Sequence, residues 1–304
     1  CRVVNGMKRF TIGCIGARTT AFKTTRFDEI GLQKNGITVE AFDLSEVFYK
    51  VNAKEDNDPA VLAKKERLEN YTDFSNVPED KKIMLSKISV VIDEYVEEYH
   101  LDALAIRCWN EMETILRVCP CVLLSELNDR GIATSCEIDL TSAISMRAMQ
   151  LASEQPTAVL DWNNNYGDAE DKLILFHCGS CAQSLMTKKG TVTSHKMFDK
   201  GDPGSGWGTN EGRIHPFKTT ISNCLTVDGK IKIYASEAEF TDDPIEDAYF
   251  GCAGVCQIPN MEDKMIRLAR GGFKHHTCVG VGHMKDILKE AFTTYLVYEW
   301  VDID

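Results

Sequence analysis

Two short apolar stretches of the chain each end in a carboxylate. Residues 133–139 are Ala-Thr-Ser-Cys-Glu-Ile-Asp, and residues 159–162 are Val-Leu-Asp-Trp. Both have the bounded apolar character of buried strands, and residues 140–152 between them place apolar side chains at helical spacing. The pattern predicts a strand–helix–strand unit with Glu137 and Asp161 at the carboxyl ends of neighbouring strands, where open α/β sheets bind ligands.

This predicted pair of carboxylates restricts the chemistry of the site. Two carboxylates held close together repel each other unless a cation or a shared proton lies between them. We therefore expect Glu137 and Asp161 to bind a hard metal ion, to carry out acid/base chemistry, or to do both. The simpler alternative is that each carboxylate caps a helix or pairs with an arginine.

Strands and helices alternate in the first half of the chain. The expected strands are residues 10–16, 37–42, 102–107 and 132–137. The expected helices are residues 19–33, 59–71, 83–98 and 120–130. This order predicts a parallel sheet flanked by helices, because parallel strands need crossover connections.

The pattern changes after Pro156, where helices become scarce. Strands are expected at residues 173–177, 190–198, 217–227, 230–240 and 249–257, a glycine-rich loop at 201–208, a late helix at 286–292 and a last strand at 294–300. Asp228-Gly229 lies between two β-rich runs and favours a hairpin. The predicted class is α/β: an α/β domain over residues 1–155, then a mostly antiparallel, barrel-like or sandwich domain over 156–304.

Composition narrows the possible function classes. A length of 304 residues favours two domains, and the net charge of −12 argues against nucleic acid as a partner. No stretch of the sequence is apolar for long enough to suggest a membrane span, and no secretory signal is evident, so a cytoplasmic location is expected. The sequence opens with Cys1 rather than Met, as a processed chain or a fragment would.

A pair of histidines supplies a third candidate group. Gly271-Gly272-Phe273-Lys274-His275-His276-Thr277 is unusual for a core segment, although each histidine could simply occupy a turn. Glutamate, aspartate and histidine together suit Mn²⁺ (manganese) better than Zn²⁺, which favours thiolates. If they meet, they do so in the cleft between the two predicted domains.

The twelve cysteines suggest a second kind of site. Cys178 and Cys181 have the spacing of a zinc or redox motif, and Cys252 and Cys256 could complete a four-thiolate set. The second pair, however, lies within an apolar strand. Buried thiols in a reducing compartment are therefore expected rather than a disulfide framework or a structural zinc ion.

In combination, these motifs resemble the L-fucose isomerase family. The resemblance rests on Cys136-Glu137-Ile138-Asp139, on Asp161 24 residues after Glu137, and on His276 followed by Gly282-His283. The His-His-Thr run is similar to that of the related L-arabinose isomerases. The resemblance covers nearly the whole chain and implies a Mn²⁺-dependent aldose–ketose isomerase that works through an enediol.

The resemblance also implies roles for particular residues. Glu137, Asp161 and His276 match the metal ligands, and the two carboxylates match the groups that move protons. His275 is adjacent to His276, and His177 lies where the arabinose enzymes supply another histidine ligand. Trp109, Trp162 and Trp207 could stack on a monosaccharide substrate, or could simply be packed in the core.

The chain departs from the family at its beginning. Fucose isomerases carry a further α/β domain before the part that this chain matches, and in the homo-oligomer, a trimer or hexamer, that domain of a neighbouring subunit helps to close the site. The chain is therefore expected to be the carboxyl-terminal portion of a longer protein or a shortened relative. The alternatives are a sugar-binding relative that has lost the chemistry and a zinc-stabilised interaction module.

Overall fold

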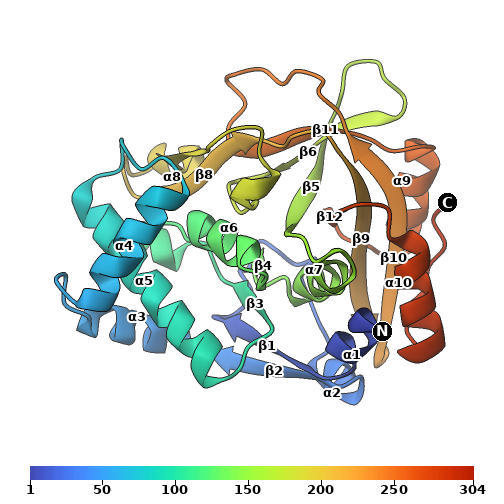
Figure 1. Cartoon of the computed structure of the whole chain (residues 1–304), viewed down its shortest axis with the longest axis horizontal. Helices are drawn as coiled ribbons and strands as arrows, with labels where there is room; N and C mark the ends of the chain where they lie inside the picture. Colours follow the sequence, from blue (N-terminus) through green and yellow to red (C-terminus); the bar gives the residue numbers. More distant parts are fainter.

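The computed structural model describes residues 1–304 and contains two β-sheets (Figure 1). The first sheet has the order β2-β1-β3-β4, and its neighbouring strands are all parallel. Its strands are β1 (Phe10–Ile15), β2 (Ile37–Phe42), β3 (Ala103–Ile106) and β4 (Ala133–Cys136). Every residue of β3 and β4 is buried, as expected for parallel strands that are covered on both faces.

Helices surround this parallel sheet. They are α1 (Arg2–Lys8), α2 (Glu29–Lys34), α3 (Leu44–Ala53), α4 (Pro59–Tyr71), α5 (Glu79–Glu98), α6 (Cys121–Asp129) and α7 (Leu140–Ser153), with a π-helical turn, η1, at Met112–Leu116. The predicted α/β class with a parallel sheet between helices is confirmed. The prediction for α4 was correct to the residue, because Asp58 caps its first turn and Pro59 occupies its first position.

The second sheet contains a closed barrel. Its strands are β5 (Thr157–Asn165), β6 (Lys172–His177), β7 (Thr191–Ser194), β8 (Trp207–Arg213), β9 (Phe217–Val227), β10 (Lys230–Phe240), β11 (Cys252–Gln257), β12 (His276–Val281) and β13 (Glu299–Trp300). Strands β10, β9, β12, β5, β6 and β11 follow one another as antiparallel neighbours. The pairs Glu239–Gln257 and Phe240–Cys256 join β11 back to β10, which closes the ring and confirms the barrel-like prediction.

Helix α7 lies between the parallel sheet and the barrel (Figure 1). Ten of its fourteen residues are buried, which is typical of a helix covered on all sides. One hydrophobic cluster combines side chains of α7 with side chains of β1, β9 and β12. The change of sheet falls between β4 and β5, and the predicted domain boundary after residue 155 remains a prediction.

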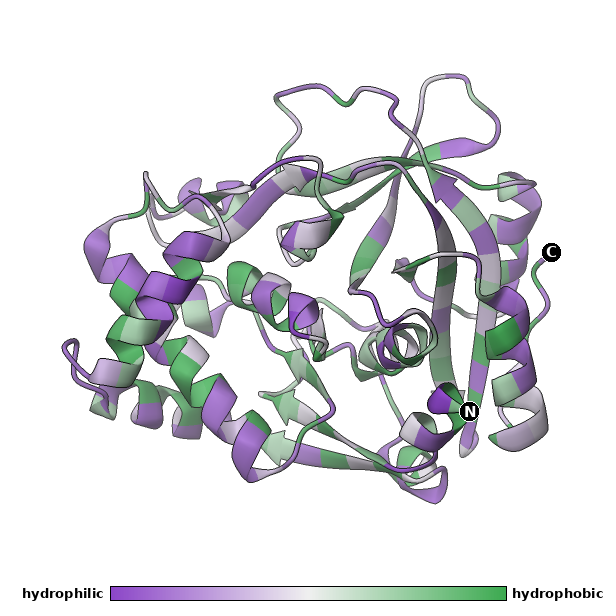
Figure 2. Cartoon of the chain, viewed as in Figure 1, coloured by the Kyte–Doolittle hydropathy of each residue, from purple (hydrophilic) through white to green (hydrophobic).

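The remaining helices lie in the second half of the chain. They are α8 (Lys196–Asp199), α9 (Met261–Arg270) and α10 (Lys285–Glu290), together with the short turns η2 (Gln183–Leu185) and η3 (Ala291–Tyr295). Hydrophilic residues dominate α9 and the two loops that project at the top of the molecule, whereas β1 and β3 are mainly hydrophobic (Figure 2). No helix has both the length and the apolar character needed to cross a membrane.

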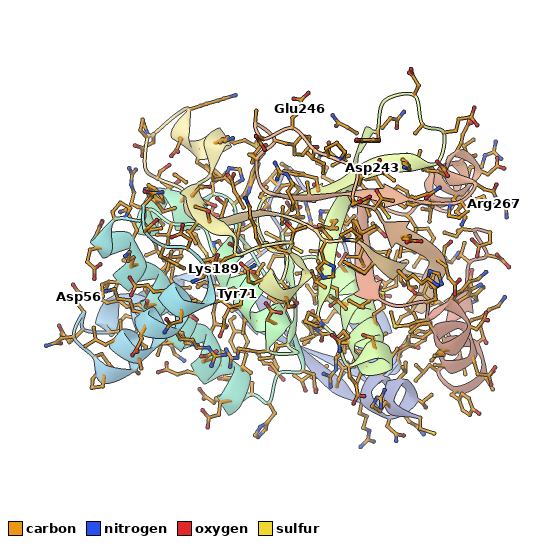
Figure 3. All side chains as sticks on the ribbon, turned by 45° about the horizontal axis from the view of Figure 1, so that its top comes forward. Asp56, Tyr71, Lys189, Asp243, Glu246 and Arg267 are labelled. Carbon is orange, nitrogen blue, oxygen red and sulfur yellow. The ribbon has the colours of Figure 1, made fainter.

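Side chains at the junction of the two halves form polar contacts. The Tyr71 hydroxyl donates to Asp129 at 2.6 Å and accepts from the Gln183 backbone N–H at 2.9 Å. Asp243 and Glu246 lie in the loop that connects β10 to β11 (Figure 3). The two halves are therefore held together by polar as well as apolar contacts.

The predicted helix at residues 19–33 is wrong over most of its length. Only α2 is helical there, and residues 17–28 form an irregular segment. The Thr19 hydroxyl donates to the Trp109 carbonyl at 3.0 Å, and the Thr25 hydroxyl donates to the Glu137 carbonyl at 3.2 Å. Threonine hydroxyls offer the backbone alternatives to helix, and here they fix a loop beside Glu137.

The predicted neighbourhood of the two key strands is also wrong. β4 is the edge strand of the parallel sheet, whereas β5 pairs with β12 and β6 in the barrel. Asp161 is the fifth residue of β5 rather than its end. The run predicted as a last strand, residues 294–300, is extended only at Glu299–Trp300, and the strand predicted at 190–198 gives way to α8 after Ser194. The helices α1, α3, α8 and α9 and the strands β8 and β12 were not predicted.

Truncation of a side chain at the barrel seam should reveal how much the closure contributes. Phe240 is fully buried at the closing pair, so Phe240→Ala should lower the free energy of unfolding by about 3–5 kcal/mol. Tyr49→Ala, at a position that is 75% exposed, should change it by less than about 0.5 kcal/mol. Urea unfolding followed by circular dichroism measures both, and similar losses for the two variants would contradict this account.

Candidate active site

Glu137 occupies a tight turn between β4 and α7. Its φ is +63° and that of Ile138 is +59°, so two successive residues with side chains adopt the left-handed conformation. This conformation costs about 1–2 kcal/mol per residue and often accompanies function. The Thr25 hydroxyl at the Glu137 carbonyl and the Ile138 N–H at the Ile106 carbonyl, 3.3 Å away, hold the turn in place.

Asp161 and His276 meet because of strand register. They are direct partners in the antiparallel pair β5–β12, so their side chains emerge next to each other on one face. His276 Nε2 lies 3.3 Å from Asp161 Oδ1 and 3.3 Å from Glu137 Oε2. The three residues that the sequence indicated are thus brought together between the parallel sheet and the barrel.

Asp139 is a functional candidate to which the sequence argument assigned no role. Its carboxylate is fully buried, caps α7 by accepting from the Ser142 N–H at 3.0 Å, and pairs with Lys274. It also accepts from His276 Nδ1 at 2.6 Å. An aspartate directly before a helix is a recognisable capping signal, but the contacts with Lys274 and His276 depend on tertiary structure.

The contact with Asp139 determines which nitrogen of His276 faces the site. Because Nδ1–H donates to Asp139, the lone pair of Nε2 can point towards Glu137 and Asp161. A carboxylate behind a histidine is the common arrangement at metal centres, where it fixes the tautomer and strengthens the ligand. Asp139 is therefore a positioning residue for His276.

The electrostatics of the cluster favour a positive charge at its centre. Burial alone would lower the pKa of His276, but its contacts with Asp139 and Glu137 outweigh burial and raise the pKa to about 10. Burial alone would raise the pKa of Glu137, but His276 lowers it instead. The pKa of Asp139 is lowered as well, since Lys274 and His276 outweigh its burial. Without a metal ion, a proton on Nε2 supplies this charge.

Several buried polar atoms in the cluster have no hydrogen-bond partner. They are Glu137 Oε2, Asp161 Oδ1, His276 Nε2 and His177 Nε2. Buried polar atoms are seldom left unpaired, and such atoms call for an explanation, for example an ion. Two groups of ligand atoms share His276, one with Glu137 and His177 and one with Asp161 and His275, and within each group the atoms lie within 4.8 Å of one another. Oxygen and imidazole donors of this kind fit Mn²⁺.

The other two candidate histidines differ from His276. His177 Nδ1 accepts from the Cys178 N–H at 3.0 Å, which in a neutral ring leaves the proton on Nε2 and makes that atom a donor. His275 Nε2 lies 3.5 Å from Asp161 Oδ1, and its side chain is 45% exposed. Both are placed to contact a ligand of the cluster, His177 from the buried side and His275 from solvent.

The candidate tryptophans occupy different environments. Trp109 has ring centroid distances of 5.1 Å to Phe198 and 6.0 Å to His195. Trp162 follows Asp161 in β5 and so projects from the opposite face, where it packs against the hydrophobic core of the barrel. Trp207 packs against the core beside the parallel sheet. Trp109 also packs against this core, and a role for any of the three in substrate binding stays a prediction.

His195 is a further residue that the sequence argument missed. It is buried, its Nε2 has no partner, and burial lowers its pKa to about 4. It is therefore neutral at physiological pH and adds a polar atom to the aromatic group around Trp109. No motif in the sequence distinguishes His195 from an ordinary turn residue.

The four cysteines of the possible zinc set are not brought together as a metal centre. All twelve cysteines are unpaired, and no group of ligand atoms within 4.8 Å of one another contains Cys178, Cys181, Cys252 or Cys256. Cys256 lies in the hydrophobic core of the barrel, where burial raises its pKa well above the usual range for a thiol. The expectation of buried, reduced thiols agrees with these surroundings.

Substitution of Asp139 tests its role as a positioning residue. Asp139→Asn keeps the helix cap but leaves Lys274 without its counter-charge, so we expect a loss of about 3–5 kcal/mol in stability. The affinity for Mn²⁺ should fall about 10- to 100-fold, as measured by calorimetry on the folded fraction. Asp28→Asn, at the cap of α2, is the matched control and should leave Mn²⁺ affinity unchanged. Wild-type affinity in Asp139→Asn would refute the role.

The pKa of His276 predicts how metal affinity depends on pH. Because that pKa is raised to about 10, Nε2 must lose a proton before it can bind an ion, and lower pH favours the proton. The apparent affinity for Mn²⁺ should therefore fall about tenfold for each unit of pH decrease between about pH 9 and pH 6. Calorimetry in buffers with different ionisation enthalpies should show release of about one proton, and an affinity independent of pH would contradict this assignment.

Comparison with known proteins agrees with the resemblance found in the sequence. Residues 175–304 match the family described as L-fucose isomerase, C-terminal domain. The chain is 23% identical over 292 residues to a sulfoquinovose isomerase of Priestia aryabhattai. The aligned region makes up 95% of this chain and 64% of that protein. A sulfoquinovose isomerase of Alkalicoccus urumqiensis is 28% identical over 183 residues, 60% of this chain and 41% of that protein.

A third relative, a sulfoquinovose isomerase of Clostridium sp., is 29% identical over 150 residues, which is 49% of this chain and 33% of that protein. The chain thus spans just under two thirds of the length of the Priestia relative, at 64%. The matched family segment contains His276 and most of the barrel. The resemblance to the L-fucose isomerase family is thereby confirmed, and residues 175–304 match the model of its C-terminal domain.

Proposed function

We propose that this chain carries the active centre of a metal-dependent aldose–ketose isomerase of the fucose isomerase type. The observation that supports it most directly is the convergence of Glu137 Oε2, Asp161 Oδ1 and His276 Nε2, all buried and without hydrogen-bond partners. These atoms come from the turn after β4, from β5 and from β12. Their convergence from such distant points of the chain favours a ligand-binding role over three separate structural roles.

Glu137, Asp161 and His276 are the residues that would hold the ion, and Mn²⁺ is the ion we propose. When bound, it would supply Lewis-acid stabilisation of the negative charge that develops on the sugar oxygens. Asp139 would keep Nε2 of His276 directed at the site. The oxygen-rich donor set makes Zn²⁺ a weaker candidate.

The two carboxylates would carry out the proton transfers. One accepts the proton from C2 of the open-chain aldose while O1 gains a proton, which gives a cis-enediol. The second supplies a proton to C1 while O2 loses one, which leaves the ketose. Glu137 is buried and Asp161 is partly exposed, so Asp161 would be the more accessible of the two to an incoming sugar.

The surroundings of the carboxylates suit a monosaccharide. His177, His195 and His275 offer imidazole groups for hydroxyl recognition, and Trp109 offers an aromatic face. The relatives are named sulfoquinovose isomerases, so sulfoquinovose is the first substrate to test, followed by L-fucose and L-arabinose. We also propose a homo-oligomer, a trimer or hexamer, because the family resemblance implies one.

The competing proposal is a sugar-binding relative, or a partial site, without turnover. It is favoured by the 64% coverage of the Priestia relative, since groups outside this chain could complete the site. Incubation of each aldose with the chain and Mn²⁺ in D₂O, followed by NMR, distinguishes the two. Ketose with deuterium at C1 supports isomerisation, whereas binding by calorimetry without exchange or ketose supports the competing proposal.

Replacement of Glu137 by glutamine tests the proton-transfer role. Glu137→Gln should preserve the fold, because glutamine has nearly the same shape, and should reduce kcat by about 10²- to 10⁴-fold. Glu98→Gln, on the exposed end of α5, is the control and should retain full activity. Measurement of bound Mn²⁺ in each variant separates loss of the ion from loss of proton transfer, and retained turnover in Glu137→Gln would refute the assignment.

A further inference from the structure

Two thiols lie directly behind the Glu137 turn. Cys136 is the last residue of β4, and Cys108 follows the end of β3, the neighbouring strand. Their sulfur atoms are 2.8 Å apart, and both side chains are almost completely buried. Both cysteines are free, and their sulfur separation exceeds the roughly 2.05 Å of a disulfide bond, so the two thiols are close but not bonded to each other.

The carboxylate of Glu137 completes a group of three ligand atoms. The two sulfur atoms and a Glu137 oxygen all lie within 4.8 Å of one another. Glu137 also belongs to the group that contains His177 and His276. One carboxylate thus belongs both to a group with two imidazole nitrogens and to a group with two sulfur atoms.

The two groups of ligand atoms would prefer different metal ions, because their donor atoms differ. Thiolates select soft or borderline ions such as Zn²⁺, Cd²⁺ and Co²⁺, whereas carboxylate and imidazole accept Mn²⁺. Two thiolates on one zinc ion, each at about 2.3 Å, stand about 3.7 Å apart. The observed separation of 2.8 Å between the sulfur atoms is about 1 Å shorter than this, so binding requires the two side chains to move apart by that amount.

We propose that Cys108, Cys136 and Glu137 form a second metal site, specific for thiophilic divalent ions. When such an ion binds, each thiol transfers its proton to solvent, and two metal–sulfur bonds and one metal–oxygen bond form. Because Glu137 belongs to both groups of ligand atoms, the ion competes for this carboxylate with an ion held by Glu137, Asp161 and His276. A thiophilic ion would therefore act as an inhibitor that withdraws a shared ligand.

Cobalt titration tests the site without any sugar substrate. Addition of Co²⁺ to the metal-free, reduced chain should produce the near-ultraviolet charge-transfer absorption of cobalt–thiolate bonds. Cys108→Ser and Cys136→Ser should each reduce the amplitude at least twofold, and the double variant should abolish it. Cys224→Ser is the matched control, because Cys224 is equally buried and its thiol donates to the Thr141 carbonyl, and it should retain the absorption.

Competition tests the sharing of Glu137. A large excess of Mn²⁺ should raise the Co²⁺ concentration for half-maximal absorption at least tenfold in the wild-type chain. Circular dichroism and thermal melting confirm that each variant is folded, and a serine variant that fails this check is replaced by alanine at the same position. Absence of the absorption in the wild type, its persistence in the double variant or its insensitivity to Mn²⁺ would overturn the proposal, and none of these outcomes depends on isomerase activity.

Discussion

The buried carboxylate of Asp139 is the contact on which the arrangement of the site depends. It caps α7, which follows the last strand of the parallel sheet, and it binds Lys274 and His276 at the start of the barrel strand β12. A fully buried carboxylate is stable only when it is paired and hydrogen-bonded, and here both halves of the molecule supply the partners. The same bonds that satisfy Asp139 therefore fix the positions of Glu137 and His276 relative to each other.

The pairing register of the barrel strands fixes the position of Asp161 relative to His276. A shift of β12 by one residue against β5 would turn His276 to the interior of the barrel and leave Asp161 without its partner. Closure through β10 and β11 leaves the six strands of the ring without a free edge along which they could slip. The barrel thus holds the Asp161 carboxylate and the His276 imidazole side by side, next to Glu137.

Local sequence signals predicted much of the fold. Asp58 and Pro59 mark the start of α4, and Asp228-Gly229 marks the β9–β10 hairpin, because each acts through its own backbone. The helix predicted at residues 19–33 was wrong around Thr19 and Thr25, because their hydroxyls donate hydrogen bonds to carbonyls about a hundred residues away along the chain. The assignment of β5 beside β4 failed for a similar reason: an apolar run does not reveal which sheet it joins.

The sequence indicated the three candidate ligands, but not the residues that hold them in position. Glu137 and Asp161 were predicted from apolar runs that end in carboxylates and His276 from the histidine pair, the motif resemblance agreed with them, and the structure brings the three together. Asp139, Lys274 and His195 were missed as functional candidates because their importance lies in contacts across the chain, not in spacing along it. The pairing of Cys108 with Cys136 likewise follows from the adjacency of β3 and β4, which cysteine spacing alone does not reveal.

The left-handed pair at Glu137 and Ile138 has an evolutionary consequence. Glycine or asparagine would adopt this backbone at lower cost, so selection for stability alone would replace both residues. Glutamate and isoleucine place a long acidic side chain and its buried neighbour at these positions in spite of that conformational cost. In a descendant released from its chemistry, these two positions should be among the first to drift towards small, flexible residues.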